Sequence, residues 1–226
     1  MILAAGRGER MRPLTDHTPK PLLKINDKPL ILLIINSLRE AGIKDLVINL
    51  AHLGAQIEAA LGDGAALGVR IRYSHEAEAL ETAGGITQAL PLLGSEPFLV
   101  VNGDVCSDYD FSAVKQAATG LSATGRLAHL VLVPNPPQHP RGDFALDRDR
   151  VLADGGERHT FSGIGAYHPA LFAGVAAGSK ARLADLLRPA MHEGRVSGEL
   201  FGGIWQDIGT PQRLAEADRA ARAAAR

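Results

Sequence analysis

The sequence predicts an α/β fold: a mixed, mainly parallel, Rossmann-like sheet with helices on both faces. Short apolar runs alternate with helical patterns over the first two thirds of the chain. A glycine-rich loop follows the first apolar run at once, and Asn102-Gly103-Asp104 follows a later one. Folds of this kind bind their ligands beyond the carboxyl ends of the parallel strands. We therefore expect one domain with its site at that edge of the sheet.

The first part of the chain is expected to alternate strand and helix. Pro29 stands in the first turn of one helical pattern, and Gly42 follows its end. Thr82 is the expected N-cap of another helix, which Gly94 stops. The predicted strands are residues 1–4, 46–50, 69–73 and 98–101, and the predicted helices are residues 29–41, 56–61 and 82–93.

The last third of the chain has the pattern of an annex that adds strands to the same sheet. Gly202-Gly203 is a good two-residue turn, so the apolar runs on either side of it are expected to form a hairpin. The tail is rich in Ala and Arg and is expected to be helical. The predicted strands here are residues 129–133, 144–146, 161–167, 197–201 and 204–208, and the predicted helices are residues 182–192 and 214–226.

Composition excludes several classes of protein. The chain has 226 residues, with 24 Lys and Arg against 25 Asp and Glu, so its net charge of −1 argues against bulk electrostatic binding to nucleic acid or to a membrane. A single cysteine, Cys106, excludes an internal disulfide and a cysteine-based zinc site. The longest apolar stretch, residues 30–35, is too short to span a bilayer, and no signal peptide is visible. We expect a cytoplasmic protein, and the few large apolar residues in its tail favour a monomer.

The glycine loop reads Ala4-Ala5-Gly6-Arg7-Gly8-Glu9-Arg10-Met11. Two glycines around one residue let the backbone curl and bring N–H groups close to phosphate oxygens. Met11 stands where the dinucleotide fingerprint needs its third glycine, and the P-loop pattern is absent. From the sequence of this loop alone, a phosphate-binding loop and a simple turn with solvated arginines are equally good interpretations.

Three further residues favour phosphate chemistry. Lys20 lies between two prolines that restrain the backbone, which indicates that its side chain is aimed rather than mobile. Asp104 and Asp207 are each expected to end a strand, although either alone could be a turn residue or a helix cap. Together they could share one Mg²⁺, which takes one or two carboxylates plus phosphate and water oxygens.

Four motifs occur in order along the chain: L-A-A-G-R-G-E-R-M-R-P-L-T near the start, then P-K-P-L, V-N-G-D and W-Q-D-I-G-T. With these motifs the chain resembles the sugar-1-phosphate nucleotidyltransferase family from residue 1 to about residue 213. The resemblance implies a GT-A-like fold, with residues 1–110 binding the nucleotide and residues 111–226 forming the sugar-binding half and the C-terminal helix. Two positions depart from the family pattern, Glu9 where many members have Thr and Ala83 where a third glycine is expected.

The resemblance also implies a reaction and a set of roles. UMP would pass from UTP to N-acetylmuramate 1-phosphate, with Mg²⁺ as cofactor and pyrophosphate as the second product. Mannose, glucose or N-acetylglucosamine 1-phosphate with GTP, dTTP or UTP is the alternative, and a non-catalytic nucleotide-sensing module is a third reading. The implied site residues are Arg10 and Lys20 for catalysis; Ala5, Gly6, Gly8, Glu9, Arg10, Thr82 and Gly84 for the nucleotide; Asn102, Arg141, Gly142, Asp143, Ser162 and Gly163 for the sugar; and Asp104 and Asp207 for the metal.

N-acetylmuramate differs from other amino sugars by its lactyl carboxylate. Arg141, with His139 behind it, is the candidate for binding that charge, because this cation stands directly before the expected sugar-binding turn. A solvated loop arginine is the competing interpretation.

Overall fold

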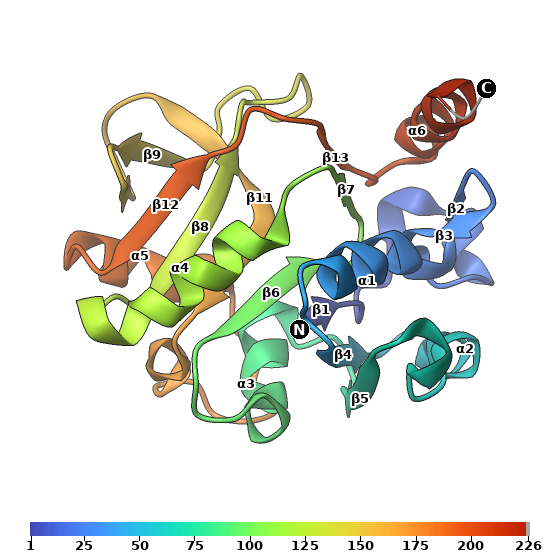
Figure 1. Cartoon of the computed structure of the whole chain (residues 1–226), viewed down its shortest axis with the longest axis horizontal. Helices are drawn as coiled ribbons and strands as arrows, with labels where there is room; N and C mark the ends of the chain where they lie inside the picture. Colours follow the sequence, from blue (N-terminus) through green and yellow to red (C-terminus); the bar gives the residue numbers. More distant parts are fainter. Residues whose placement is uncertain (225–226) are drawn as a thin grey trace.

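A nine-stranded mixed sheet forms the centre of the molecule in the computed structural model, which describes residues 1–224 (Figure 1). The strand order is β5-β4-β1-β6-β11-β8-β12-β10-β9. Neighbours among the first four strands, β5, β4, β1 and β6, run parallel, and β11 joins them antiparallel to β6. The sheet strands are β1 (Ile2–Leu3), β4 (Asp45–Leu50), β5 (Arg70–His75), β6 (Phe98–Asn102), β8 (Ala128–Val133), β9 (Phe144–Asp147), β10 (Arg150–Leu152), β11 (Arg158–Tyr167) and β12 (Val196–Leu200).

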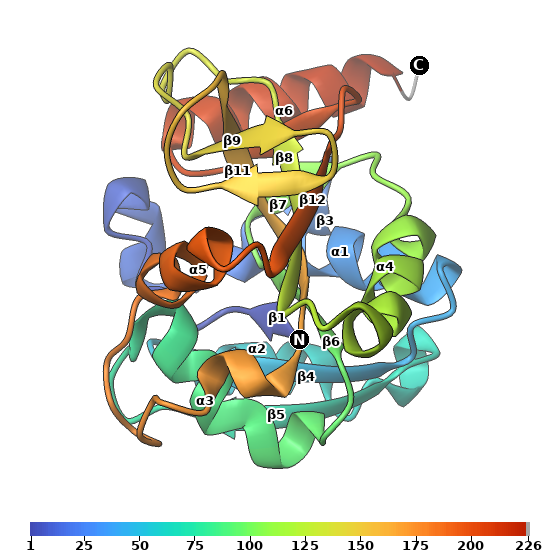
Figure 2. The same cartoon turned by 90° about the vertical axis from the view of Figure 1, so that its left-hand side faces the viewer.

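Helices cover both faces of this sheet, as predicted (Figure 2). Successive strand residues point to opposite faces, so Ile48 lies in one apolar core and Val47 in the other. The first core also holds apolar residues of α1 (Leu30–Glu40), α2 (Gly54–Leu61) and α4 (Phe111–Thr124). The second core holds those of α3 (Glu81–Leu93) and α5 (Leu183–His192).

The predicted hairpin around Gly202-Gly203 is wrong. The strand β12 pairs in parallel with β8 over five residues, whereas β13 (Trp205–Asp207) pairs antiparallel with β7 (Val105–Ser107). The turn signal is local, but each strand finds a better partner far away in sequence. This pairing carries Asp207 to the strand that follows Asp104.

Two details of the helices also differ from expectation. Thr82 is not an N-cap: α3 begins at Glu81, which has a left-handed φ of 60°. The helix α4 was not predicted, because its Ser and Gly content lowers helix propensity. Its start is nevertheless marked, because the side chain of Asp110 accepts a hydrogen bond of 2.9 Å from the backbone N–H of Ser112.

The C-terminal helix α6 (Pro211–Ala224) packs against the small hairpin of β2 (Lys24–Ile25) and β3 (Lys28–Pro29) (Figure 1). Asp218 accepts a hydrogen bond of 2.7 Å from the backbone N–H of Asn26. A third apolar cluster joins this helix to the glycine loop through Met11 and to the strand end through Ile208. The last two residues of the predicted helix, 225–226, lie outside the described residues. No helix within residues 1–224 is both long enough and apolar enough to cross a membrane.

Candidate active site

A cavity of about 390 Å³ opens at the carboxyl ends of β1, β4 and β6. The glycine loop forms one wall, and the segments after β5 and β6 form the others. Its lining includes Ala5, Gly6, Gly8, Glu9, Arg10, Lys20, Glu76, Glu81, Thr82, Asn102, Asp104 and Gly209. Most of the residues expected to contact a nucleotide are therefore together in this first cavity.

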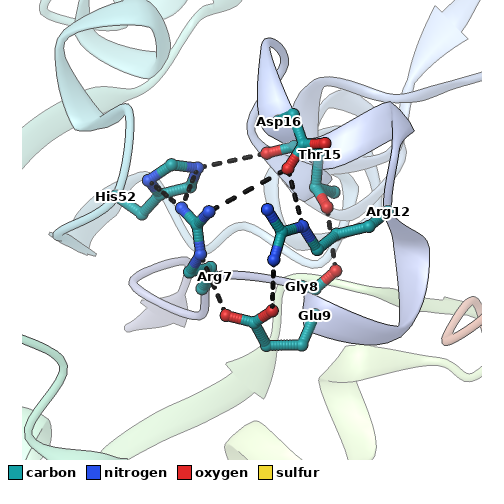
Figure 3. A network of polar contacts seen from close by, with 7 residues as sticks. All are labelled: Arg7, Gly8, Glu9, Arg12, Thr15, Asp16 and His52. Atoms are coloured by element: carbon teal, nitrogen blue, oxygen red, sulfur yellow. Dashed lines mark hydrogen bonds and ion pairs between the residues drawn. The ribbon is translucent and has the colours of Figure 1, made fainter.

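The glycine loop is held by a polar network that leaves Arg10 out (Figure 3). Arg7 contacts His52 at 2.9 Å and Glu9 at 2.9 Å, and Arg12 pairs with Asp16 at 2.7 Å. Arg10 makes no ion pair with any residue in the described part of the chain, and it lines the cavity. Of the three loop arginines, two hold the loop and the third is available for a ligand.

Gly8 has a structural reason to be glycine. Its φ of 69° is left-handed, and a Cβ there would lie 3.0 Å from the Cγ2 atom of Thr15. The Thr15 hydroxyl donates a hydrogen bond of 2.9 Å to the carbonyl of Gly8. The curl expected of a phosphate cradle is therefore present.

Lys20 reaches Asp104 across 84 residues of sequence. The Lys20 ammonium and the Asp104 carboxylate form an ion pair, with side chains only 13% and 23% exposed. The neighbouring Gly103 has no room for a side chain, because a Cβ would lie 2.5 Å from the carbonyl oxygen of Leu3. Close packing of the β1 and β6 ends thus fixes Asp104 beside the lysine.

Asp207 lies beside Asp104 in the structure. Residue 207 stands opposite Val105 in the β7–β13 pair, and the N–H of Ile208 donates to the carbonyl of Asp104 at 2.9 Å. The Asp207 carboxylate pairs with Arg213 of α6 and accepts a hydrogen bond of 3.1 Å from Gln138. Both carboxylates line another cavity, of about 290 Å³, together with Arg10, Asn102, Gln138, His139, Ser162 and Trp205. We call it the third cavity, because a second one, described below, adjoins the first.

The donor set at this point suits a hard divalent cation. Within the described chain, no group of three or more His, Cys, Asp or Glu side chains is arranged around a common point. Two carboxylates alone agree with the coordination of Mg²⁺, which completes its shell with phosphate and water oxygens. A Cβ at Gly209 would lie 2.9 Å from the Asp207 carboxylate and 3.1 Å from the Arg10 guanidinium. Arg10, which is expected to bind phosphate, is therefore close to Asp207, which is expected to bind the metal.

A buried polar chain that the sequence analysis missed supports the first cavity. The N–H of Ala4 donates to Asn49 at 2.8 Å, Asn49 donates to Glu76 at 2.7 Å, and Glu76 accepts from the N–H of Leu80 at 2.9 Å. Asn49 and Glu76 are both buried. A polar residue inside the apolar run 46–50 was the available signal. These buried hydrogen bonds join the glycine loop to the segment that leads into α3.

Thr82 and Gly84 have different surroundings. Thr82 lines the first cavity, whereas Gly84 is buried against the segment before α5. A Cβ at Gly84 would overlap the backbone carbonyl of Ser179. Gly84 therefore provides close packing and lies outside the cavity lining.

A second cavity of about 350 Å³ adjoins the first and shares Leu3, Glu81, Thr82 and Asn102 with it. Its remaining lining is Val100, Asp143, Phe144, Phe161, Gly163, Tyr167, Arg182, Leu183, Ala184 and Leu187. Asn102 lines all three cavities, and Gly163, with a φ of 80°, packs directly against it. The expected sugar-binding residues Asn102, Asp143 and Gly163 thus meet in one place.

Three other expected sugar-binding residues lie differently. The Ser162 hydroxyl is buried and donates to the carbonyl of Val131 at 2.6 Å, which stabilises a bulge in β11. Gly142 is buried against Asn135 and Arg158 and lines none of the three cavities. Arg141 is exposed and is also absent from their linings.

Comparison with known proteins places these observations in a family. The nucleotidyl transferase family model matches residues 1–151. The chain is 58% identical to N-acetylmuramate alpha-1-phosphate uridylyltransferase of Neisseria meningitidis serogroup B, over 99% of this chain and 98% of the relative. It is 34% identical to the enzyme of the same name from Caulobacter vibrioides, over 96% and 97%. It is 30% identical to a mannose-1-phosphate guanylyltransferase catalytic subunit beta of Drosophila pseudoobscura, of which it spans 59%.

Solved structures show the same fold. A Bacillus anthracis structure assigned as a glucose-1-phosphate thymidylyltransferase, in complex with sucrose, superimposes with a TM-score of 0.85 at 21% identity, covering 98% of this chain and 94% of that one. An apo UDP-glucose pyrophosphorylase superimposes with a TM-score of 0.75 at 20% identity, covering 100% and 98%. At these identities the likeness confirms the mixed α/β fold.

Proposed function

Because this chain belongs to the nucleotidyl transferase family, we propose that it transfers UMP from UTP to N-acetylmuramate 1-phosphate and releases pyrophosphate. The observation that carries the proposal is the 58% identity to an N-acetylmuramate alpha-1-phosphate uridylyltransferase over nearly the full length of both chains. The meeting of Arg10, Lys20, Asp104 and Asp207 at one sheet edge supports it, because a nucleotide-sensing module has no need of all four. We place the reaction in peptidoglycan recycling and in the cytoplasm, and we expect a monomer.

The chemistry asks for cations and alignment rather than for a base. An oxygen of the sugar phosphate attacks the α-phosphorus of UTP, the bond from that phosphorus to the β-phosphate oxygen breaks, and pyrophosphate leaves with the electron pair. A phosphate monoester has its second pKa near 6, so the nucleophile is mostly a dianion at neutral pH. The main barrier is repulsion between two anions and the charge that grows on the leaving group.

Arg10 and Lys20 would supply the fixed positive charge. Arg10 lines both the first and the third cavity and would bind the β- and γ-phosphates beside the N–H groups of Gly8 and Glu9. Lys20 would lie between the α-phosphate and the incoming sugar phosphate and reduce their repulsion. Removing one fixed donor that faces developing charge typically lowers kcat by about 10²–10³.

Asp104 and Asp207 would hold the Mg²⁺, which supplies positive charge to the phosphate oxygens when bound. In the structure each carboxylate already has a cationic partner, Lys20 for Asp104 and Arg213 for Asp207. Release of Lys20 from Asp104 would free its ammonium for the phosphates. The chain's own cations thus hold the two carboxylates in place before the ligands bind.

The two halves of the chain would divide the substrates. Residues 1–110 provide most of the first cavity, and we assign the nucleotide to it, with Ala5, Gly6 and Thr82 around the nucleoside. The second cavity, which takes Asp143 and Gly163 from residues 111–226, would hold the sugar. Asn102 lies where the two cavities meet.

The test is a substrate matrix. Purified protein is incubated with Mg²⁺, inorganic pyrophosphatase, four nucleoside triphosphates and the 1-phosphates of N-acetylmuramate, N-acetylglucosamine, glucose and mannose, and phosphate release is followed. We expect UTP with N-acetylmuramate 1-phosphate to dominate and the signal to disappear in Asp104→Ala. A dominant signal from another pair would refute the substrate assignment, and silence across the matrix would refute the enzyme assignment.

A further inference from the structure

The second cavity presents more acidic than basic side chains. Glu81 and Asp143 line it, and Arg182 is the one Lys or Arg in its lining within the described chain. Asp143 is held in place, because its carboxylate accepts a hydrogen bond of 2.8 Å from the N–H of Phe161 and contacts His139 at 3.1 Å. A sugar that carries a carboxylate therefore meets two like charges here, and its binding needs a cation within reach.

Arg182 has donors left for such a ligand. It directly precedes α5, whose first residues Leu183 and Ala184 line the same cavity. Its Nε and Nη2 atoms donate to Asp185 at 3.0 and 3.1 Å. No residue in the described part of the chain accepts a hydrogen bond from Nη1, so one end of the planar guanidinium remains open to an anion. The side chain is 69% exposed, which puts it at the mouth of the cavity.

The remaining wall of the cavity is apolar. Phe144, Phe161, Tyr167 and Leu187 line it, and the Tyr167 and Phe144 side chains are buried. Such a wall suits methyl groups, of which N-acetylmuramate has one on its acetyl group and one on its lactyl group. A lactyl group in the second cavity would thus meet apolar side chains for its methyl and a single arginine for its carboxylate.

Arg141, the sequence-based candidate for this charge, has a weaker position. It is exposed and lines none of the three cavities, although His139 and Asp143 of the same segment do line cavities. The sequence could not favour Arg182, because only the fold carries the residue before α5 to the cavity that also contains Asp143.

We propose that Arg182 binds the lactyl carboxylate of the sugar substrate and thereby selects N-acetylmuramate over uncharged amino sugars. The proposal rests on the proposed function, whose substrate it deepens. An arginine–carboxylate contact at an exposed cavity mouth supports a preference of about tenfold, which corresponds to about 1.4 kcal/mol. The carboxylate is remote from the reacting phosphorus, so the contact acts equally in the ground state and the transition state and its loss raises KM more than it lowers kcat.

The test compares N-acetylmuramate 1-phosphate with its lactyl methyl ester, which keeps the shape and removes the charge. The ratio of kcat/KM for the acid to that for the ester is measured with saturating UTP for wild type, Arg182→Met, Arg182→Lys, Arg141→Met and Lys180→Met. This ratio does not depend on how much of a variant is folded, because both substrates meet the same enzyme. Lys180 is the matched control: it lies two residues away, pairs with Glu78 and lines none of the three cavities.

We expect the wild type to prefer the acid by about tenfold, Arg182→Met to lose most of that preference, Arg182→Lys to keep part of it, and Lys180→Met to keep all of it. An Arg182→Met variant with the wild-type ratio overturns the proposal while leaving the proposed function intact. So does a result in which Arg141→Met loses the preference for the acid and Arg182→Met keeps it. A wild type that uses neither muramyl substrate but accepts another sugar 1-phosphate overturns both.

Discussion

Arg213 and Gln138 hold Asp207 at the end of a strand of only three residues. The arginine comes from α6, so the helix at the end of the chain takes part in positioning an expected metal ligand. Arg213 also places a positive charge where a divalent cation is expected to bind. These two effects oppose each other, and the charge effect is the larger for a cation that binds the same carboxylate.

Replacing Arg213 with Met is therefore expected to tighten Mn²⁺ binding, with Mn²⁺ standing in for Mg²⁺, by a few fold (about 1 kcal/mol). Titration by electron paramagnetic resonance in the absence of nucleotide measures this affinity directly. Arg219→Met is the control, because Arg219 is an exposed residue of the same helix. Weaker Mn²⁺ binding in Arg213→Met than in the control would contradict this balance.

Asn49 is the centre of the buried chain that joins the glycine loop to the start of α3. Asn49→Ala removes both of its hydrogen bonds and leaves the N–H of Ala4 and the carboxylate of Glu76 short of partners in a buried place. We expect the free energy of unfolding to fall by about 2–3 kcal/mol. Urea denaturation measures it. Asn36→Ala is the control, because Asn36 is half-buried on α1 and its side chain makes no hydrogen bond within residues 1–224; we expect it to change the free energy of unfolding by less than about 1 kcal/mol.

For single residues, sequence motifs identify charged side chains whose expected role depends on their own chemistry. Arg10, Lys20, Asp104 and Asp207 were predicted in this way, and the structure brings them to one edge of the sheet. Asn49 and Glu76 were not predicted, because their function depends on contacts between strands. The same limitation explains Gly84 and Gly142, which look like ligand-binding glycines and are required by close packing.

At the scale of elements, local signals predicted most helices and strands but did not determine their partners. Gly202-Gly203 allows a hairpin, yet β12 completes the large sheet and β13 pairs with β7. Pairing between distant segments depends on which apolar faces are buried together, and a single sequence contains little of that information. The consequence is functional, since the β7–β13 pair is what brings Asp207 beside Asp104.

Two glycines in helices allow a test of close packing between elements. Gly84→Ala in α3 would place a methyl group against the carbonyl of Ser179, a backbone atom in the segment that leads to Arg182. Gly120→Ala in α4 meets nothing within 4 Å. We expect the first change to destabilise the protein by about 1–3 kcal/mol and the second to stabilise it by about 0.5–1 kcal/mol. Thermal and urea unfolding measure both changes. A Gly84→Ala variant with the wild-type free energy of unfolding would show that α3 is not tightly packed against this segment.

For the whole molecule, acid stability depends in part on a contact between two strands of the sheet and Tyr109, which lies in the segment before α4. Glu199 of β12 pairs with His129 of β8 at 3.8 Å and accepts a hydrogen bond from the hydroxyl of Tyr109. The His129 contact, followed by the Tyr109 hydrogen bond, holds the pKa of Glu199 below its ordinary value of 4.5, although partial burial acts in the opposite direction.

Because the pKa of Glu199 is lower in the folded state, its contribution to stability is complete above about pH 4.5 and is lost as the pH falls through the lower, folded value. Glu199→Gln is expected to flatten the dependence of unfolding free energy on pH below that value and to leave its slope at higher pH unchanged. Urea unfolding at a series of pH values measures this. An unchanged acid slope in the variant would show that Glu199 titrates alike in both states.

We propose that the carboxylates of Asp104 and Asp207, from distant parts of the chain, form one metal site for uridylyl transfer. The most direct measurement is the rate of UDP-N-acetylmuramate formation as a function of Mg²⁺ concentration for wild type, Asp104→Ala, Asp207→Ala and the double variant. We predict that chelation of Mg²⁺ abolishes the wild-type rate, that each single variant loses at least about 10², and that the double variant is little worse than either, because both residues serve one ion. A single variant with the wild-type rate and Mg²⁺ dependence, or losses that multiply in the double variant, would show that the two carboxylates do not share one ion.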